Sequence, residues 1–147
     1  MPEPSSTSPA LSASCHCGAV RIEIDEPPAL LTQCNCSICR RYGALWAYYT
    51  RRIVRVVAGS DQLETYTWQD HEVQFQRCRS CGCVTHWDSA DLSDAGRIGV
   101  NARNIDQQAA IAHTPIKLLD GDGDWETLST WVQPDLFISP TRLKQDV

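Results

Sequence analysis

The sequence predicts a mainly β domain, and three observations support this prediction. Short segments alternate between apolar and polar residues, as strands with one buried face do. No segment has the sustained periodicity of a long amphipathic helix. Eight cysteines stand in three tight groups, which suit metal binding and can join distant strands. We therefore expect packed β-sheets with short helical turns.

Length and N-terminal composition predict one folded domain. A chain of 147 residues fits the usual range of roughly 100–200 residues per domain. Because the first residues are rich in Ser, Pro and Ala, we expect a disordered leader over 1–13 and a single β domain over 14–147. The leader lacks the basic region and apolar core of a secretory signal. No segment approaches the roughly 20 apolar residues that span a bilayer, so we expect a cytoplasmic protein without a membrane partner.

Most strands are predicted from alternation and from β-branched or aromatic residues. The first, 20–24, places three apolar side chains on one face and two charged ones on the other. The segments that favour strands are 20–24, 30–33, 45–50, 53–57, 62–68, 73–77, 84–87 and 97–101. Helical turns are expected at 37–42, which Ser37 can cap and Gly43 ends, and at 105–110. The acidic segment 120–124 lacks the glycine and glutamate spacing of a calcium loop, which favours a solvated turn.

The cysteines are spaced as metal ligands. The groups are Cys15 and Cys17; Cys34, Cys36 and Cys39; and Cys78, Cys81 and Cys83. Thiolates two or three residues apart can share one Zn²⁺ ion at about 2.3 Å. In a reducing compartment such spacing indicates metal or redox chemistry rather than disulfides. Gly82 permits a turn with positive φ that directs backbone amides at the sulfur atoms.

The ligand count predicts two different zinc sites. Two pairs, Cys15/Cys17 and Cys78/Cys81, can close a four-thiolate structural site. The triplet Cys34, Cys36 and Cys39 leaves a fourth position open, as catalytic sites do. An alternative is that the triplet recruits Cys83 or a histidine and forms a second closed site. We interpret Cys83 itself as a small buried apolar residue.

An open three-thiolate zinc site could bind a thiol and hold it as a thiolate, which then attacks an aldehyde. Arg40 and Arg41 follow Cys39 directly, so they could bind a substrate carboxylate or offset the charge of the site. Trp46, Tyr48 and Tyr49 could line a pocket, although aromatic residues in strands usually lie in the core. His86 is interpreted as an ordinary strand histidine.

The net charge of the chain and the sequence around its cysteines help to weigh functions other than thiol chemistry. The net charge of -5, which thiolate–zinc binding makes more negative, argues against a nucleic-acid partner and favours a small molecule. A non-catalytic zinc module that binds a protein or other ligand is the main alternative to an enzyme. A thiol redox protein is a third, but the βαβ context of such motifs is missing.

The cysteine blocks and their neighbours resemble those of the glutathione-dependent formaldehyde-activating enzyme family, which also contains centromere protein V. The matching blocks are 15–20, 34–44 and 78–82, within a likeness from Ser14 to about Trp131. The resemblance implies a β-tent of packed antiparallel sheets joined by zinc. It implies structural zinc ligands at Cys15, Cys17, Cys78 and Cys81, and a more labile zinc site at Cys34, Cys36 and Cys39. It also implies addition of glutathione to formaldehyde, giving S-(hydroxymethyl)glutathione, a carbon–sulfur lyase reaction in reverse.

Overall fold

The protein is mainly β, as predicted, and its computed structural model describes residues 8–67 and 72–132. Two short α-helices, α1 (Ser37–Tyr42) and α2 (Gln108–Ile111), accompany the strands, with 3-10 turns at Arg51–Ile53, Ser60–Gln62 and Ala102–Asn104. The strands are β1 Leu11–Ser14, β2 Arg21–Ile24, β3 Leu31–Cys34, β4 Trp46–Thr50, β5 Val54–Ala58, β6 Leu63–Thr67, β7 Val73–Cys78, β8 Val84–Ser89, β9 Arg97–Asn101, β10 Ile116–Leu119 and β11 Thr127–Trp131. No helix in the described ranges is long and apolar enough to cross a membrane.

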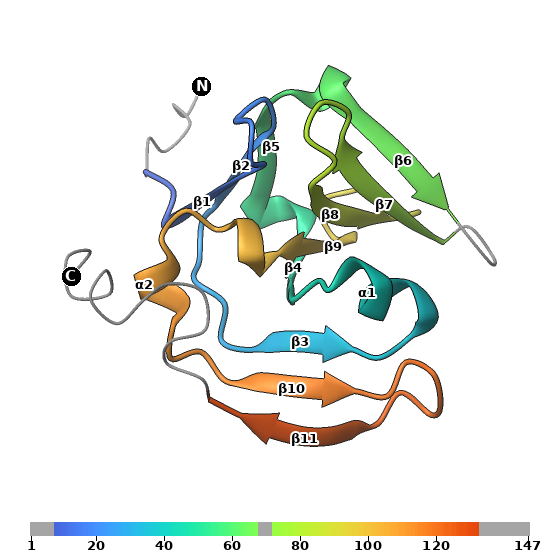
Figure 1. Ribbon diagram of the computed structural model, residues 1–147. Coiled ribbons are helices and arrows are strands. Elements are labelled where there is room, and N and C mark those ends of the chain that lie inside the picture. Colours follow the sequence, from blue (N-terminus) through green and yellow to red (C-terminus); the bar gives the residue numbers. More distant parts are fainter. Residues whose placement is uncertain (1–7, 68–71, 133–147) are drawn as a thin grey trace.

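The strands of the described ranges form two sheets. One has the order β1-β2-β5, and the other has the order β11-β10-β3-β4-β9-β8-β7-β6. In Figure 1 the larger sheet bends, so that β6, β7 and β8 lie on one side of α1 while β3, β10 and β11 lie on the other. The pairs are antiparallel except β3 with β10, which are parallel. This parallel pair departs from the expected antiparallel sheets because β10 returns from α2 along the free edge of β3.

One face of the larger sheet forms the apolar core against the smaller sheet. Strand residues alternate between faces, so Ala47 of β4 points the same way as Ile98 and Val100 of β9, and Leu45, just before β4, packs with them. These side chains cluster with the apolar residues of β1, β2 and β5. The strict alternation of β2 places Ile22 and the other apolar residues of that strand in this core, as its sequence predicts.

The opposite face of the larger sheet carries aromatic residues and three cysteines. Trp46 packs there with Phe75 and Trp87, beside the cysteines at 34, 36 and 39. Gly99 makes room for one of these rings, because a Cβ at this position would lie 2.0 Å from the Trp87 indole nitrogen. Because Gly99 has no side chain, the Trp87 ring of β8 can lie over the neighbouring strand β9.

The first strand of the described residues begins before the predicted domain boundary. Leu11–Ser14 pairs with β2, so the leader expected over 1–13 is wrong at its C-terminal end. The hydroxyl groups of Ser12 and Ser14 both donate hydrogen bonds to Asp106, at 2.8 and 2.5 Å. These polar contacts hold a segment whose composition suggested disorder. Residues 1–7 and Trp68, the last residue of the strand expected at 62–68, lie outside the described residues.

The helical turn α1 has the predicted bounds but a different N-cap residue. Cys36 is its N-cap residue, and no side chain caps the turn, so the cap expected from Ser37 is wrong. Gly43 ends the helix with a φ of 62°, as predicted. The second helical turn, expected at 105–110, is α2 at Gln108–Ile111. The helix α1 thus places both Cys36 and Cys39 next to the end of β3.

Candidate metal centres

The first centre joins two segments that lie far apart in the sequence. Cys15 and Cys17 lie in the turn between β1 and β2, Cys78 is the last residue of β7, and Cys81 lies in the turn between β7 and β8. Their Sγ atoms all lie within 4.8 Å of one another. The Cys15–Cys17 and Cys17–Cys78 Sγ distances are both 3.6 Å. A tetrahedral ion with bonds of about 2.3 Å separates its sulfur ligands by about 3.8 Å, so the four thiols fit such an ion.

Glycine turns shape both ligand pairs. Gly18 and Gly82 follow the second cysteine of each pair and have φ values of 81° and 78°. Their amides donate to the carbonyls of Cys15 and Cys78, at 3.0 and 2.8 Å. The left-handed turns direct further amides at the sulfurs, as the Val20 amide does toward Cys15 Sγ at 3.3 Å. The turn predicted from Gly82 is present in the structure.

Backbone amides favour the thiolate form in the Cys78 turn. Hydrogen bonds from the amides of Cys81 and Ser80 lower the pKa of Cys78 against the effect of burial. Burial raises the pKa of Cys81, but hydrogen bonds from the amides of Cys83 and Cys17 outweigh this effect. The net pKa is lowered to about 5. Metal ligation needs deprotonated thiols, so the turn is arranged for a cation before one binds.

The second centre is the cysteine triad, defined as Cys34, Cys36 and Cys39. Cys34 ends β3, Cys36 precedes α1 and Cys39 lies within it. All three are buried, and their Sγ atoms lie within 4.8 Å of one another. Cys83 is not part of this group, and neither is any histidine of the described ranges. The closed site considered as an alternative therefore has no fourth ligand in that part of the chain.

Hydrogen bonds polarise the triad. The Trp46 indole N–H donates to Cys39 Sγ at 3.3 Å. The pKa of Cys34 is lowered to about 6, first because Cys39 donates a hydrogen bond to it and then because the amides of Cys36 and Gly121 do so. The pKa of Cys39 is raised for the same reason, since it is the donor to Cys34. One buried thiolate is thus favoured even with the other thiols protonated.

A cavity of about 570 Å³ opens beside the triad. Its walls combine aromatic and charged side chains. The lining residues besides the triad are Ile38, Trp46, Tyr48, Glu72, Val73, Phe75, Trp87, Arg97, Lys117, Leu119 and Trp125. The cavity can admit a small molecule to the position that three cysteines leave open.

The acidic turn at 120–124 forms part of this site. Asn35, between two of the triad cysteines, donates to Asp120 at 3.0 Å and accepts from the Asp122 amide at 3.1 Å. A Cβ at Gly121 would lie 2.4 Å from Cys34 Sγ, so the backbone passes directly over the sulfur. Trp125 has a φ of 61°, a rare conformation for a large side chain. Sequence reasoning treated this turn as solvated and missed its contact with the triad.

The other residues singled out from the sequence have different positions. Arg40 and Arg41 are exposed on α1 and do not line the cavity, and Arg41 donates to the carbonyl of Ser37 at 2.7 Å. The cations that line it are Arg97 and Lys117, which the sequence analysis did not consider. Cys83 is partly buried and packs beside the first centre, outside its four ligands. Trp46 and Tyr48 do line the cavity.

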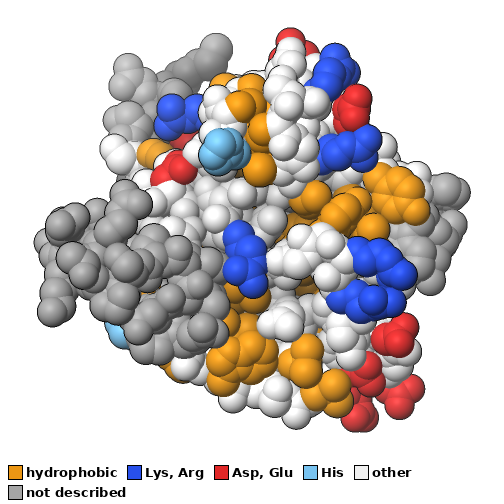
Figure 2. All heavy atoms as spheres, viewed as in Figure 1, with side chains coloured by type: hydrophobic (Ala, Val, Ile, Leu, Met, Phe, Trp, Pro, Cys, Tyr) orange, Lys and Arg blue, Asp and Glu red, His pale blue; other side chains and the backbone are white. Residues whose placement is uncertain are grey.

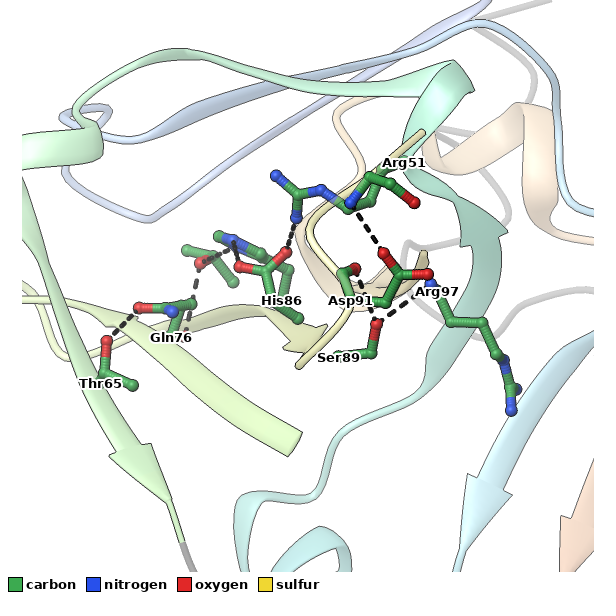
Figure 3. A network of polar contacts seen from close by, with 10 residues as sticks. Arg51, Thr65, Gln76, His86, Ser89, Asp91 and Arg97 are labelled. Atoms are coloured by element: carbon green, nitrogen blue, oxygen red, sulfur yellow. Dashed lines mark hydrogen bonds and ion pairs between the residues drawn. The ribbon is translucent and has the colours of Figure 1, made fainter. Parts of the chain in front are cut away.

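His86 belongs to a polar network on the other face of β8. Its Nδ1 lies 2.8 Å from the hydroxyl of Thr85, and its Nε2 lies 3.5 Å from Asp88, which also pairs with Arg51. Figure 3 shows this network extending from His86 to Arg51 on one side and to Gln76 on the other. Because His86 is only 2% exposed and does not line the cavity, it has the structural role predicted for it.

The fold and the two centres define a β protein with two cysteine groups that could hold metal ions. The sequence matches the family described as glutathione-dependent formaldehyde-activating enzyme over residues 10–116. The chain belongs to this family. A crystal structure of a Rhodobacter sphaeroides protein is similar, with 35% sequence identity and a TM-score of 0.56 over 65% of this chain and 87% of the other. The family supports a role that involves glutathione and formaldehyde.

Proposed function

We propose that the cysteine triad holds a zinc ion and activates a thiol for making or breaking a carbon–sulfur bond. One observation carries this proposal: three buried thiols lie together on the wall of a cavity large enough for a substrate. Catalytic zinc sites have three protein ligands and one open position, whereas structural sites are closed. The four-cysteine group then serves as the structural zinc site.

Glutathione and formaldehyde are the leading substrates because the family description names them. The glutathione sulfur bonds to the formaldehyde carbon while the thiol loses its proton. The carbonyl oxygen gains a proton, so the product is S-(hydroxymethyl)glutathione and the reaction conserves all atoms. In the opposite direction the same chemistry is a carbon–sulfur lyase reaction.

Zinc bound at the triad would lower the pKa of an incoming thiol and so favour its thiolate. The chain supports this chemistry with hydrogen bonds to two ligand sulfurs, from Trp46 to Cys39 and from the Cys36 amide to Cys34 at 3.5 Å. These donors withdraw charge from the sulfurs. Phe75 and Trp87 are buried beside the triad and limit the access of water.

The proposed ligands require reduced thiols, and all eight cysteines are free in the structure. Disulfides persist in oxidising compartments, whereas glutathione keeps cytosolic thiols reduced. We therefore propose a cytoplasmic location, where the thiol substrate is also supplied.

Exchange NMR on glutathione and formaldehyde tests the proposal, because the adduct also forms without an enzyme and only a rate above background counts. We expect the zinc-loaded protein to accelerate exchange and Cys36→Ser to lose the acceleration. Cys83→Ser, which alters a cysteine outside both groups, is the matched control and should retain the wild-type rate. Equal rates for wild type, Cys36→Ser and buffer would reject this substrate pair. The absence of any thiol-dependent change in the spectrum of the Co²⁺-loaded protein would reject thiol activation as a whole.

A further inference from the structure

A second cavity, of about 650 Å³, adjoins the first. Three residues line both cavities, namely Tyr48, Arg97 and Lys117. The second cavity continues past them along Pro27, Pro28 and the ring of Tyr49. The two hollows therefore meet at these three side chains, and we call them together the substrate path, with the cysteine triad in the first hollow and the two cations where the hollows meet.

The register between β10 and β3 sets the distance between Lys117 and the cysteine triad. Leu119 pairs with Cys34, and Lys117 pairs with Thr32, two residues earlier on the same face. Two residues along a strand span about 7 Å. Arg97 approaches from β9, with its guanidinium carbon 5.3 Å from the centre of the Tyr48 ring and 5.9 Å from that of Trp87. A ligand with its sulfur at the triad can therefore present a second group to these cations.

The charges of Arg97 and Lys117 are not paired within the described residues. Four other arginines, at 51, 55, 77 and 79, form ion pairs with Asp or Glu side chains. Neither the Arg97 guanidinium nor the Lys117 ammonium has such a carboxylate partner in the described ranges; the guanidinium lies over the Tyr48 and Trp87 rings instead. In Figure 3 the Arg97 side chain extends away from the network around His86. Two positive groups thus face the substrate path, where an anion can join them.

We propose that Arg97 and Lys117 bind a carboxylate of an extended thiol substrate and position its sulfur at the triad. The remainder of the substrate lies in the second cavity, against Pro27, Pro28 and Tyr49. This inference rests on the proposed thiol chemistry and adds the residues that would recognise the substrate, Arg97 and Lys117, which favour thiols with a carboxylate several bonds from sulfur over short neutral thiols. It also replaces Arg40 and Arg41, which lie outside both cavities, as the carboxylate contacts.

Calorimetric titration of the zinc-loaded protein with glutathione and with its diethyl ester tests the proposal. The ester keeps the thiol and loses both carboxylates. We expect the wild type to bind the ester about tenfold more weakly, a typical loss for a charge-assisted contact. Arg97→Gln and Lys117→Gln should weaken glutathione binding by a similar factor and leave ester binding unchanged. Arg97→Lys should restore part of the loss, because it keeps the charge.

Arg40→Gln is the matched control, since it removes an exposed arginine close to the triad and should change neither dissociation constant. Equal affinity of the wild type for glutathione and its ester would overturn the proposal. So would an equal loss for both ligands in Arg97→Gln and Lys117→Gln, or a selective loss in Arg40→Gln. If Cys36→Ser abolishes binding of both ligands while carboxylates have no effect, the thiol chemistry stands and only this inference fails. If neither ligand binds the wild type, both are rejected.

Discussion

The side chain of Asn35 donates a hydrogen bond of 3.0 Å to the carboxylate of Asp120, a residue 85 positions later in the chain. Asn35 is the spacer between Cys34 and Cys36, so this bond ties the ligand loop to the turn between β10 and β11. The same side chain accepts from the Asp122 amide. The two contacts hold the turn in place over the Cys34 sulfur.

We expect Asn35→Ala to weaken metal binding at the triad. Groups that orient metal ligands typically change affinity by about 10–100-fold when removed, and the lower end is appropriate for a partly exposed contact. A competition titration with a chromogenic chelator measures this affinity. Asn104→Ala, which removes a remote hydrogen bond to the Val84 carbonyl, is the control. Equal affinities in the two variants would show that the Asn35 contacts do not orient the ligands.

Cys78→Ser is expected to lose the four-cysteine metal and to lower the melting temperature at the same time. The reason is that this centre joins the β1–β2 turn to the β7–β8 turn across 61 sequence positions. Structural zinc sites contribute folding free energy directly. Metal analysis and thermal unfolding of the same samples test this, with Cys83→Ser as control. A full metal content with an unchanged melting temperature in Cys78→Ser would refute the structural assignment.

Brief chelation is expected to remove the triad metal first. Three protein ligands with an exchangeable fourth bind less tightly than a closed set of four, and the adjoining cavity gives a chelator access. Metal content before and after mild chelation should fall from two ions per chain towards one. Cys36→Ser should begin at one ion and change little. Retention of both ions by the wild type under these conditions would contradict an open site.

The Asp88 network should make the folded state sensitive to acid. Burial raises the pKa of Asp88, but His86 and Arg51 outweigh this effect and lower it below its usual range. A lowered folded-state pKa stabilises the protein above the unfolded value of about 3.9, and this stability is lost as pH falls through the folded value. Asp88→Asn should therefore cost about 1–3 kcal/mol near neutral pH, with a shrinking difference below about pH 4.

Chemical denaturation of both proteins between neutral and acidic pH measures this difference. Asp91→Asn is a suitable comparison, because the pKa of Asp91 is also lowered, by hydrogen bonds from Ser93, but the residue is exposed. Its effect should be smaller. A cost for Asp88→Asn that stays constant at all pH values would show that packing, and not charge, stabilises the network.

Local patterns explain why most of the fold could be predicted. The strict alternation over Val20–Ile24 and the spacing of the cysteines depend only on neighbouring residues, so the sequence contains them directly. Strands β1, β10 and β11 could not be found this way, because their partners decide their structure. The alternation in β10 runs only from Ile116 to Leu118, because Leu119 is apolar as well, and the strand pairs in parallel with β3. Leu11–Ser14 resembles a leader until Asp106 binds its hydroxyl groups.

The candidate site was predictable to the same extent. The two cysteine groups follow from spacing, and the structure brings each of them together. The wall of the cavity does not follow from sequence spacing, because Arg97 and Lys117 reach it from strands that are distant in the sequence. Proximity to Cys39 in the chain suggested Arg40 and Arg41, but a helical turn directs consecutive side chains to different sides. Sequence distance is a poor guide to contacts across a sheet.

The family match ends at residue 116, one position before the segment that closes the cavity. Lys117, Leu119 and Trp125 line the cavity from β10 and the turn that follows it, while every cysteine of both groups lies within the matched range. Part of the proposed recognition is thus encoded outside the stretch that holds the cysteines, while Arg97 contributes to it from within the matched range. Substitutions at Lys117, Leu119 or Trp125 would reshape the cavity wall without replacing a cysteine, so members of one family can keep the same cysteine groups and differ in the molecules that they admit.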